Sequence, residues 1–543
     1  MTAALIAVQV LYAVPAKRGP FKVVQPDGSQ ITLYNNGDET CHFLTNETGE
    51  IVIQNEQGEY IVAGDQQAKA ITKRMQASRR QYRKHNDVAN QHGLVILANF
   101  ADLEFLPENT PEALEEMLNG SNYSYNGATG SARKYFQDQS SGAYNPVFDI
   151  VGPVTLPQNL AYYGMNDRVG KEPQAHIAII DACRLADSLL NIDFSQYDND
   201  NDGYVDFIYL IYAGHNEAEG ASTLTIWPHT WNLLDLGVDI NIDGKQLGTY
   251  ACTSELRGSY GKERAGIGTF CHEFGHILGF PDLYPTVNNA KHKTLDTWDI
   301  MDYGAYNNNG HTPPAYSAYE RFFFGWTKPL ILNTPNHYYI KDIQTTNACG
   351  IITQDGTSDL DGSQPQPNVF YLVENRQNNG WDTYLPGHGL MITKIQYNPD
   401  NWYNNTVNNS PDNMGIDIIE AAPATGIKAQ ASDLYPAGNN MCVPYTFYPL
   451  LNIEEDSQGI ITFQFMNGGD DAPVEITDQQ TTGIDNIPSH DNDSEIVAIH
   501  TITGQNTGIK DITRLTQGIY IITTKNKNAN STLQTKKIYV KKI

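Results

Sequence analysis

The stretch Cys271-His-Glu-Phe-Gly-His-Ile-Leu-Gly-Phe-Pro-Asp282 contains the pattern HExxHxxGxxD. His272 and His276 are four residues apart, so on a helix both imidazoles project from one face and can bind one Zn²⁺ at about 2.0–2.1 Å. Gly279 can adopt the left-handed conformation that ends a helix, and the proline two residues later prevents its continuation. The chain can then turn back and present Asp282 as a third ligand. The pattern therefore predicts a metal site at the end of a helix.

Glu273 follows the first predicted ligand directly, so it lies beside the metal and can take a proton from an activated water. Three protein ligands leave zinc an open position for water, as a hydrolytic site requires, whereas a structural zinc site is usually closed by four. The pattern is typical of zinc peptidases. The alternative is a buried amphipathic helix with two incidental histidines.

A second element, Trp298-Asp-Ile-Met-Asp-Tyr-Gly304, follows about twenty residues after the zinc pattern. It resembles the Met-turn of the metzincin-type zinc peptidases. The resemblance assigns Met301 to the apolar floor beneath the metal. It assigns Tyr303 to a phenol that hydrogen-bonds the reaction oxyanion in some members. Taken alone, both would be ordinary core and surface residues.

Several further stretches are similar to the immune inhibitor A family of secreted bacterial metallopeptidases. They are His272–Tyr284, Val151–Pro157, Pro313–Glu320, Phe370–Gln377 and Leu385–Met391. The likeness runs from about Gly93 to about Met466. It implies a zinc endopeptidase with a metzincin-like zincin domain, often made as a secreted precursor and often stabilised by calcium.

Length and charge limit the other possibilities. A chain of 543 residues is too long for one hydrophobic core, so we expect several domains. A formal net charge of −27 argues against nucleic-acid binding and against electrostatic docking on anionic membranes. It suits solubility, calcium binding or basic substrates. No stretch predicts a transmembrane anchor.

The N-terminal part of the sequence predicts a targeting segment followed by a propeptide-like segment. Residues 1–16 are apolar and end in small residues before Lys17-Arg18, which predicts a signal peptide; a buried strand is the alternative. Residues 17–90 predict a β-rich, propeptide-like domain followed by a basic linker with Lys73-Arg74, Arg79-Arg80 and Arg83-Lys84. A solvated basic helix is the alternative for that linker.

We expect the catalytic domain, a mixed α/β fold, at 91–330. Its predicted elements are the strand Leu94–Phe100, a helix over 174–190 and the strand Tyr204–Tyr212. Residues 331–467 alternate short strands with Asn, Gly and Pro turns, which predicts one β-sandwich or two small β modules. This accessory region includes core strands at 370–377 and 387–397.

The run Asp198-Asn-Asp-Asn-Asp-Gly-Tyr-Val-Asp206 lies before the second predicted strand. Carboxylates at alternate positions, followed by glycine, can wrap a structural Ca²⁺ as the start of an EF-hand does. Tyr209 stands where an EF-hand has its bidentate glutamate, so this is not an EF-hand. A solvated polar turn is the alternative. The candidate calcium ligands are Asp198, Asp200, Asp202, the backbone carbonyl of Tyr204, and Asp206.

Six cysteines permit 15 pairings. Export makes disulfides plausible, and the short segment between Cys252 and Cys271 favours a clasp that leads into the zinc helix. One hypothesis is that the thiolate of Cys41 caps the zinc in a latent form. The alternative is that Cys41 is an ordinary free or disulfide-bonded cysteine.

The chain ends with a polar linker, 468–494, and a small β domain, 495–543. Thr503–Gln505, Leu515–Ile522 and Lys536–Lys542 resemble the C-terminal sorting domains of Bacteroidetes secreted proteins. That resemblance implies export through outer-membrane secretion machinery. A final β accessory domain without a sorting role is the alternative.

These patterns together predict a secreted, zinc-dependent endopeptidase with protein or peptide substrates and Glu273 as general base, made as a zymogen. Two alternatives stay open. One is a metal-dependent surface binding or adhesion protein on the same fold, against which an intact Glu273 argues. The other is a cell-wall peptide amidase.

Overall fold

The structure is a computed structural model that describes residues 15–16, 20–38, 41–55, 59–64, 91–167, 172–287, 292–423, 425–469, 471–479, 494–501, 518–526 and 533–540. Two compact units divide the chain, Met1–Asp478 and Gln479–Ile543, and each is described by itself. Among the described residues, no helix combines the length and the apolar character needed to cross a bilayer.

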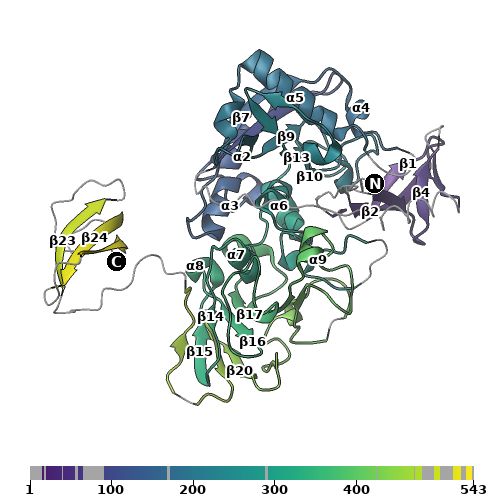
Figure 1. The fold of residues 1–543 in the computed structure, drawn as a ribbon. Helices are drawn as coiled ribbons and strands as arrows, with labels where there is room; N and C mark the ends of the chain where they lie inside the picture. Colours follow the sequence, from purple (N-terminus) through teal and green to yellow (C-terminus); the bar gives the residue numbers. More distant parts are fainter. Residues whose placement is uncertain are drawn as a thin grey trace, which may run out of the picture. The chain divides into compact units, whose positions relative to one another are not determined.

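A five-stranded sheet in the order β10-β13-β9-β6-β7 forms the centre of residues 91–330, the expected catalytic region (Figure 1). The strands β7 (Val147–Thr155), β6 (His92–Asn99), β9 (Ile208–Tyr212) and β13 (Thr249–Ser254) pair in parallel. The edge strand β10 (His229–Asn232) is antiparallel to β13.

Alternate side chains of the central strands enter two different apolar clusters, because both faces of a parallel sheet are covered by helices. Val95 and Leu97 of β6 pack in the cluster that includes α2 (Pro111–Asn119), α3 (Ala132–Gln139) and α6 (Ile267–Leu278). Leu94 and Ile96 pack with α4 (Leu160–Gly164) and α5 (Ala175–Leu190). The sheet is thus buried on both faces, with α6 on one of them.

Two of the three expected elements of this region coincide with β6 and α5, but the expected continuous strand Tyr204–Tyr212 is interrupted. β8 (Tyr204–Val205) joins a separate small sheet with β12 (Lys245–Leu247) and β11 (Asn241–Ile242). The break falls at Asp206, whose carboxylate accepts a hydrogen bond of 2.9 Å from the backbone N–H of Asn199. That contact turns the chain before β9 begins.

The N-terminal region is an antiparallel meander that packs around a small core of Leu33, Leu44 and Val52. Its strands are β1 (Pro20–Val24), β2 (Gln30–Asp38), β3 (Cys41–Thr45), β4 (Ile51–Gln54) and β5 (Tyr60–Val62). The basic linker at 73–84 lies outside the described residues.

Two sheets of the accessory region face each other across one apolar cluster that includes Ile340, Val373, Ile392 and Phe463. The first contains β14 (Leu330–Ile331), β16 (Gly350–Thr353), β17 (Val369–Arg376), β18 (Gly389–Gln396) and β19 (Ile416–Ile418). The second contains β20 (Leu450–Glu455), β21 (Ile461–Phe465), β15 (Asn336–Ile340) and β22 (Val474–Glu475). The accessory region also contains the short helices α8 (Ile343–Thr346) and α9 (Pro399–Tyr403), and α7 (Ala318–Phe323) precedes it in the chain.

Buried polar contacts join the accessory region to the end of the catalytic region. The guanidinium of Arg376 on β17 binds both carboxylate oxygens of Asp382 at 2.7 Å. Arg376 also donates to the carbonyl of Ala315 at 3.0 Å, and Asp382 accepts from the N–H of Ala315 at 2.8 Å. All three residues are fully buried, so the contact locks the two regions together.

The second unit contains β23 (Ser494–Thr501), β24 (Gly518–Asn526) and β25 (Leu533–Val540), which form an antiparallel sheet. The motif Thr503–Gln505 lies outside the described residues.

The described residues also contain the single-turn helices η1 (Tyr125–Gly127), η2 (Phe194–Tyr197), η3 (Glu217–Glu219), η4 (Leu233–Leu236), η5 (Asp296–Trp298), η7 (Gly380–Tyr384) and η8 (Ala431–Asp433), together with the longer, kinked η6 (Tyr303–Gly310).

Candidate active site

Helix α6 carries the first two predicted ligands, and every residue of it is buried. It ends as expected at Gly279, whose φ of 105° lies in the left-handed region. The N–H of Gly279 binds the carbonyls of Gly275 and His276, so the last turn is capped. The chain reverses there and brings Asp282 back towards the helix.

Two backbone carbonyls orient the imidazoles. His272 Nδ1 lies 2.7 Å from the carbonyl oxygen of Ile300, and His276 Nδ1 lies 2.7 Å from that of Phe280. A carbonyl oxygen only accepts, so each Nδ1 carries the proton and donates it. Each Nε2 then presents a lone pair, which is the form in which histidine binds a metal.

The three predicted ligand atoms form a nearly equilateral triangle. The two Nε2 atoms are 3.1 Å apart, and Asp282 Oδ1 lies 3.3 Å from Nε2 of His272 and 3.2 Å from Nε2 of His276. Two ligands on a tetrahedral ion with bonds of about 2.0–2.1 Å are about 3.3 Å apart. Asp282 Oδ1 is buried and accepts no hydrogen bond from the described residues. The donor set and its spacing therefore fit Zn²⁺.

The charge state of this triangle also suits a cation. Burial alone would raise the pKa of Asp282, but the two neighbouring imidazoles outweigh it and hold the pKa well below its usual value. Burial would lower the pKa of His272, but the nearby carboxylates of Asp282 and Glu273 raise it overall. Asp282 is therefore a carboxylate in the folded chain.

Glu273 is fully buried and is held by the edge strand of the sheet. Thr230 Oγ1 on β10 lies 2.7 Å from Oε2 of Glu273 and 3.0 Å from its backbone carbonyl oxygen. The hydroxyl donor keeps the carboxylate beside the ligand triangle. The sequence did not single out Thr230, because nothing in its local pattern indicates which side chain it meets.

Met301 lies against α6 at Gly275, between the two histidines. A Cβ atom built on Gly275 would meet Met301 Sδ at 2.7 Å, so the helix approaches the methionine as closely as only glycine allows. Asp299 Oδ1 accepts a hydrogen bond of 2.8 Å from the N–H of Met301, which fixes this turn. The predicted Met-turn residue thus lies directly under α6.

Tyr303 begins η6, two residues after Met301, and its ring centroid lies 6.4 Å from that of Tyr284. It is partly buried. Its role towards a reaction oxyanion stays a prediction.

The third ligand has a partner from the accessory region that the sequence did not single out. Asn405 accepts a hydrogen bond of 2.7 Å from the N–H of Asp282 and donates through Nδ2 to Asp282 Oδ2. Its one local signal is the asparagine-rich run Asn404-Asn-Thr-Val-Asn-Asn409, which does not indicate a partner.

The acidic loop brings together three of its five predicted calcium ligands. Ligand oxygens of Asp198, Asp200 and Asp202 lie within 4.8 Å of one another. Lys245 Nζ lies 2.6 Å from Asp198 Oδ2, so an ammonium group already balances part of this negative charge. Asp206 is not part of this group, and its Oδ2 accepts hydrogen bonds from Asn199 instead. The carbonyl of Tyr204 stays a predicted ligand.

The expected disulfide between Cys252 and Cys271 is wrong. Both are buried free thiols that belong to apolar clusters on different faces of the sheet. Cys252 Sγ lies 3.4 Å from Nδ1 of His229 instead. The backbone of Cys41 begins β3, but its side chain lies outside what the structure describes.

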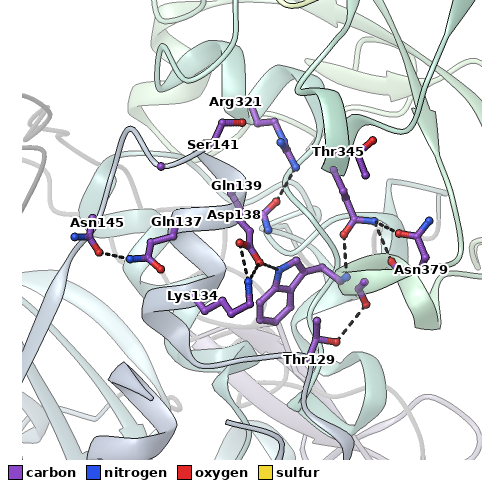
Figure 2. A pocket seen from close by; sticks show the side chains of 14 residues that line it. Thr129, Lys134, Gln137, Asp138, Gln139, Ser141, Asn145, Arg321, Thr345 and Asn379 are labelled. Atoms are coloured by element: carbon purple, nitrogen blue, oxygen red, sulfur yellow. Dashed lines mark hydrogen bonds and ion pairs between the residues drawn. The ribbon is translucent and has the colours of Figure 1, made fainter. Parts of the chain in front are cut away.

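A separate cavity of about 780 Å³ lies at the junction of the catalytic and accessory regions, and none of the predicted metal ligands lines it (Figure 2). Its polar side chains largely bind one another. Lys134 pairs with Asp138 at 2.7 Å, and Arg321 Nη2 donates to Gln139 Oε1 at 2.8 Å.

Comparison with known proteins gives one family match. Residues 77–327 match the family described as "Immune inhibitor A peptidase M6, catalytic domain". The chain is 24% identical over 406 residues to Immune inhibitor A of Bacillus thuringiensis subsp. alesti, a match that covers 69% of this chain and 54% of the relative. It is also 26% identical over 336 residues to Pre-pro-metalloprotease PrtV of Vibrio cholerae serotype O1 (strain M66-2). That match covers 54% of this chain and 34% of the relative. This chain therefore spans only part of the length of each relative.

Proposed function

We propose that this chain, whose residues 77–327 match the family described as "Immune inhibitor A peptidase M6, catalytic domain", is a zinc-dependent endopeptidase that hydrolyses proteins or peptides. The observation that carries the proposal is the triangle of His272, His276 and Asp282, with edges of 3.1 to 3.3 Å and with Glu273 next to it. The match to the M6 domain and to two relatives whose names denote an immune inhibitor and a metalloprotease supports it.

Zn²⁺ held by the three ligands would supply a Lewis acid that polarises a peptide carbonyl and acidifies a water molecule. Glu273 takes the proton of the attacking water and delivers it to the nitrogen of the leaving amine, so one carboxylate acts as base and then as acid. Thr230 keeps that carboxylate in place during both transfers. The carbonyls of Ile300 and Phe280 keep the imidazoles in the tautomer that binds metal. Tyr303 is the proposed hydrogen-bond donor to the oxyanion.

Cleavage of casein or gelatin by the purified chain, with and without a zinc chelator, tests this function. Glu273→Gln should lower kcat by at least about 10²-fold, because the amide cannot accept the proton, while zinc binding is retained. Glu116→Gln, an exposed change on α2, is the matched control. Zinc binding without cleavage of any protein would favour the surface binding protein. Release of cell-wall peptides alone would favour the amidase.

We also propose that the N-terminal region holds the enzyme latent. The meander β1–β5 lies beyond the predicted signal peptide at 1–16, so it stays on the chain after that segment is removed.

Phe21 of β1 packs on the catalytic region, since a Cβ built on Gly220 would lie 3.3 Å from its ring. Limited trypsin cleavage in the basic linker, followed by release of the N-terminal fragment, should raise casein hydrolysis. Equal rates before and after release would contradict latency.

Two further proposals concern location and calcium. The apolar N-terminus and the resemblance of residues 495–543 to sorting domains support export, with removal of the terminal segments. The gathered carboxylates of Asp198, Asp200 and Asp202 support a structural Ca²⁺ beside the strand β9. N-terminal sequencing and intact mass of the protein recovered from the culture medium test the first proposal. A calcium-dependent rise in Tm tests the second.

A further inference from the structure

The contact between Asp282 and Asn405 joins two parts of the chain that are 123 residues apart. Asn405 follows α9 in the accessory region and lies outside residues 77–327, which match the M6 catalytic domain. It is 3% exposed, and its φ of 50° lies in the left-handed region, which asparagine tolerates better than most residues. These two features indicate that position 405 requires the hydrogen-bonding side chain of asparagine.

The two hydrogen bonds use the donor and the acceptor of the amide in one orientation. The N–H of Asp282 donates to Asn405 Oδ1 at 2.7 Å, so Nδ2 faces the carboxylate and donates to Asp282 Oδ2. An aspartate at position 405 has no donor for that carboxylate. The amide of Asn405 therefore hydrogen-bonds Oδ2 of Asp282, which leaves Oδ1 directed at the Nε2 atoms of the two histidines.

The loop around Asn405 holds the whole segment that carries the third ligand. Asn408 Nδ2 donates to the carbonyl of Leu283 at 2.9 Å, and Asn409 Oδ1 accepts from the N–H of Thr286 at 2.7 Å. Asn408 Oδ1 also accepts from the N–H of Ile416 on β19 at 3.0 Å. The segment after the zinc helix is thereby fastened to a strand of the accessory sandwich.

We infer that the accessory region completes the metal centre, and that Asn405 is the positioning residue that holds Asp282 as a one-oxygen ligand. This inference rests on the proposed zinc site. Partners behind a ligand typically contribute 10–100-fold to metal affinity. The catalytic domain that the family match delimits therefore lacks part of its own metal site.

The test measures zinc affinity of the full-length, metal-free chain by competition with a chromophoric chelator. Asn405→Gly removes both hydrogen bonds and suits a positive φ, so zinc affinity should fall 10–100-fold. Asn404→Gly is the matched control, because Asn404 Nδ2 binds the carbonyl of Asp400 on its own helix, and its affinity should stay within about twofold. Circular dichroism and Tm of the metal-free proteins check that each variant is folded.

A second variant keeps the inference testable if Asn405→Gly does not fold. Asn405→Asp preserves the size and the acceptor for the Asp282 N–H but removes the donor to Oδ2. With Co²⁺ in place of zinc, its visible spectrum should lose the intensity of a four-coordinate site, because both oxygens of Asp282 can then bind the ion.

Unchanged affinity and an unchanged cobalt spectrum in both variants, with zinc bound normally by the wild type, would overturn the inference and leave the proposed function standing. A wild-type chain that binds no zinc would overturn both.

Discussion

Thr230 Oγ1 lies 2.7 Å from Oε2 of Glu273, which joins the antiparallel edge strand β10 to the zinc helix at the residue proposed to move protons. The same hydroxyl lies 3.0 Å from the carbonyl oxygen of Glu273, so the contact reaches the helix backbone as well as the carboxylate. A residue of the sheet, outside the HExxH stretch, therefore helps to position the proposed base.

Thr230→Val should lower kcat by about 5–30-fold, since it removes a hydrogen bond to a charged group while keeping a branched side chain of similar size. KM and zinc affinity should change little, because Thr230 contacts no metal ligand in the described structure. Steady-state cleavage of a fluorogenic peptide separates kcat from KM. Thr230→Ser keeps the hydroxyl and should restore most of the rate. A Val variant as active as the Ser variant would rule out this role.

Gly275→Ala should destabilise the fold by about 1–3 kcal/mol, because the new methyl group overlaps Met301 Sδ at 2.7 Å. Urea unfolding measures the change in the free energy of unfolding. Gly426→Ala, at a glycine with open space around its Cβ position, is the control and should be nearly neutral. If Met301 causes the clash, Met301→Ala should reduce the effect of Gly275→Ala in a double-mutant cycle, and strict additivity would contradict the packing described for the Met-turn.

Asp417→Asn should stabilise the chain at pH 8 and not at pH 4. Burial, together with the charge of Glu420, raises the pKa of Asp417 from 3.8 to about 6 in the folded chain. The folded state then binds this proton more tightly than the unfolded state, so the free energy of unfolding falls as pH rises from about 4 to about 6. The uncharged asparagine does not lose this stability, and the difference in the free energy of unfolding is about 1–3 kcal/mol above pH 6.

Denaturant unfolding of Asp417→Asn and of the exposed control Asp412→Asn at both pH values checks this prediction. A stabilisation of Asp417→Asn that is the same at both values would show that the carboxylate charge is not its cause.

Lys245→Met should strengthen calcium binding at the acidic loop by about tenfold, because the ammonium 2.6 Å from Asp198 repels a cation at the same carboxylates. Calorimetric titration with Ca²⁺ measures the affinity, and the calcium-induced rise in Tm should increase in parallel. Asp200→Asn should weaken binding. No calcium binding by the wild type or by Lys245→Met would leave the loop as a solvated polar turn.

The zinc-helix residues were accessible from the sequence because their geometry is local. A spacing of four places His272 and His276 on one face, and Gly279 ends the helix at the residue where the pattern requires it. The placement of Met301 under that helix followed from a resemblance, and the structure supplies its physical basis in the missing side chain of Gly275.

The features that the sequence did not reveal depend on contacts between distant residues. Thr230 and Asn405 lie 43 and 123 residues from their partners, and no spacing rule connects them. The strand expected over 204–212 is interrupted at Asp206, which hydrogen-bonds Asn199. The pattern of apolar residues gives no sign of that contact. Cys252 and Cys271 are close in sequence but belong to different sides of the sheet, so proximity along the chain was the wrong guide.

The buried junction of Arg376, Asp382 and Ala315 limits which accessory regions could be joined to this chain by recombination. Recombination that replaced the accessory region alone would leave the N–H and carbonyl of Ala315 desolvated and without partners, unless the incoming region carried an equivalent acid and guanidinium. The two regions should therefore be inherited together.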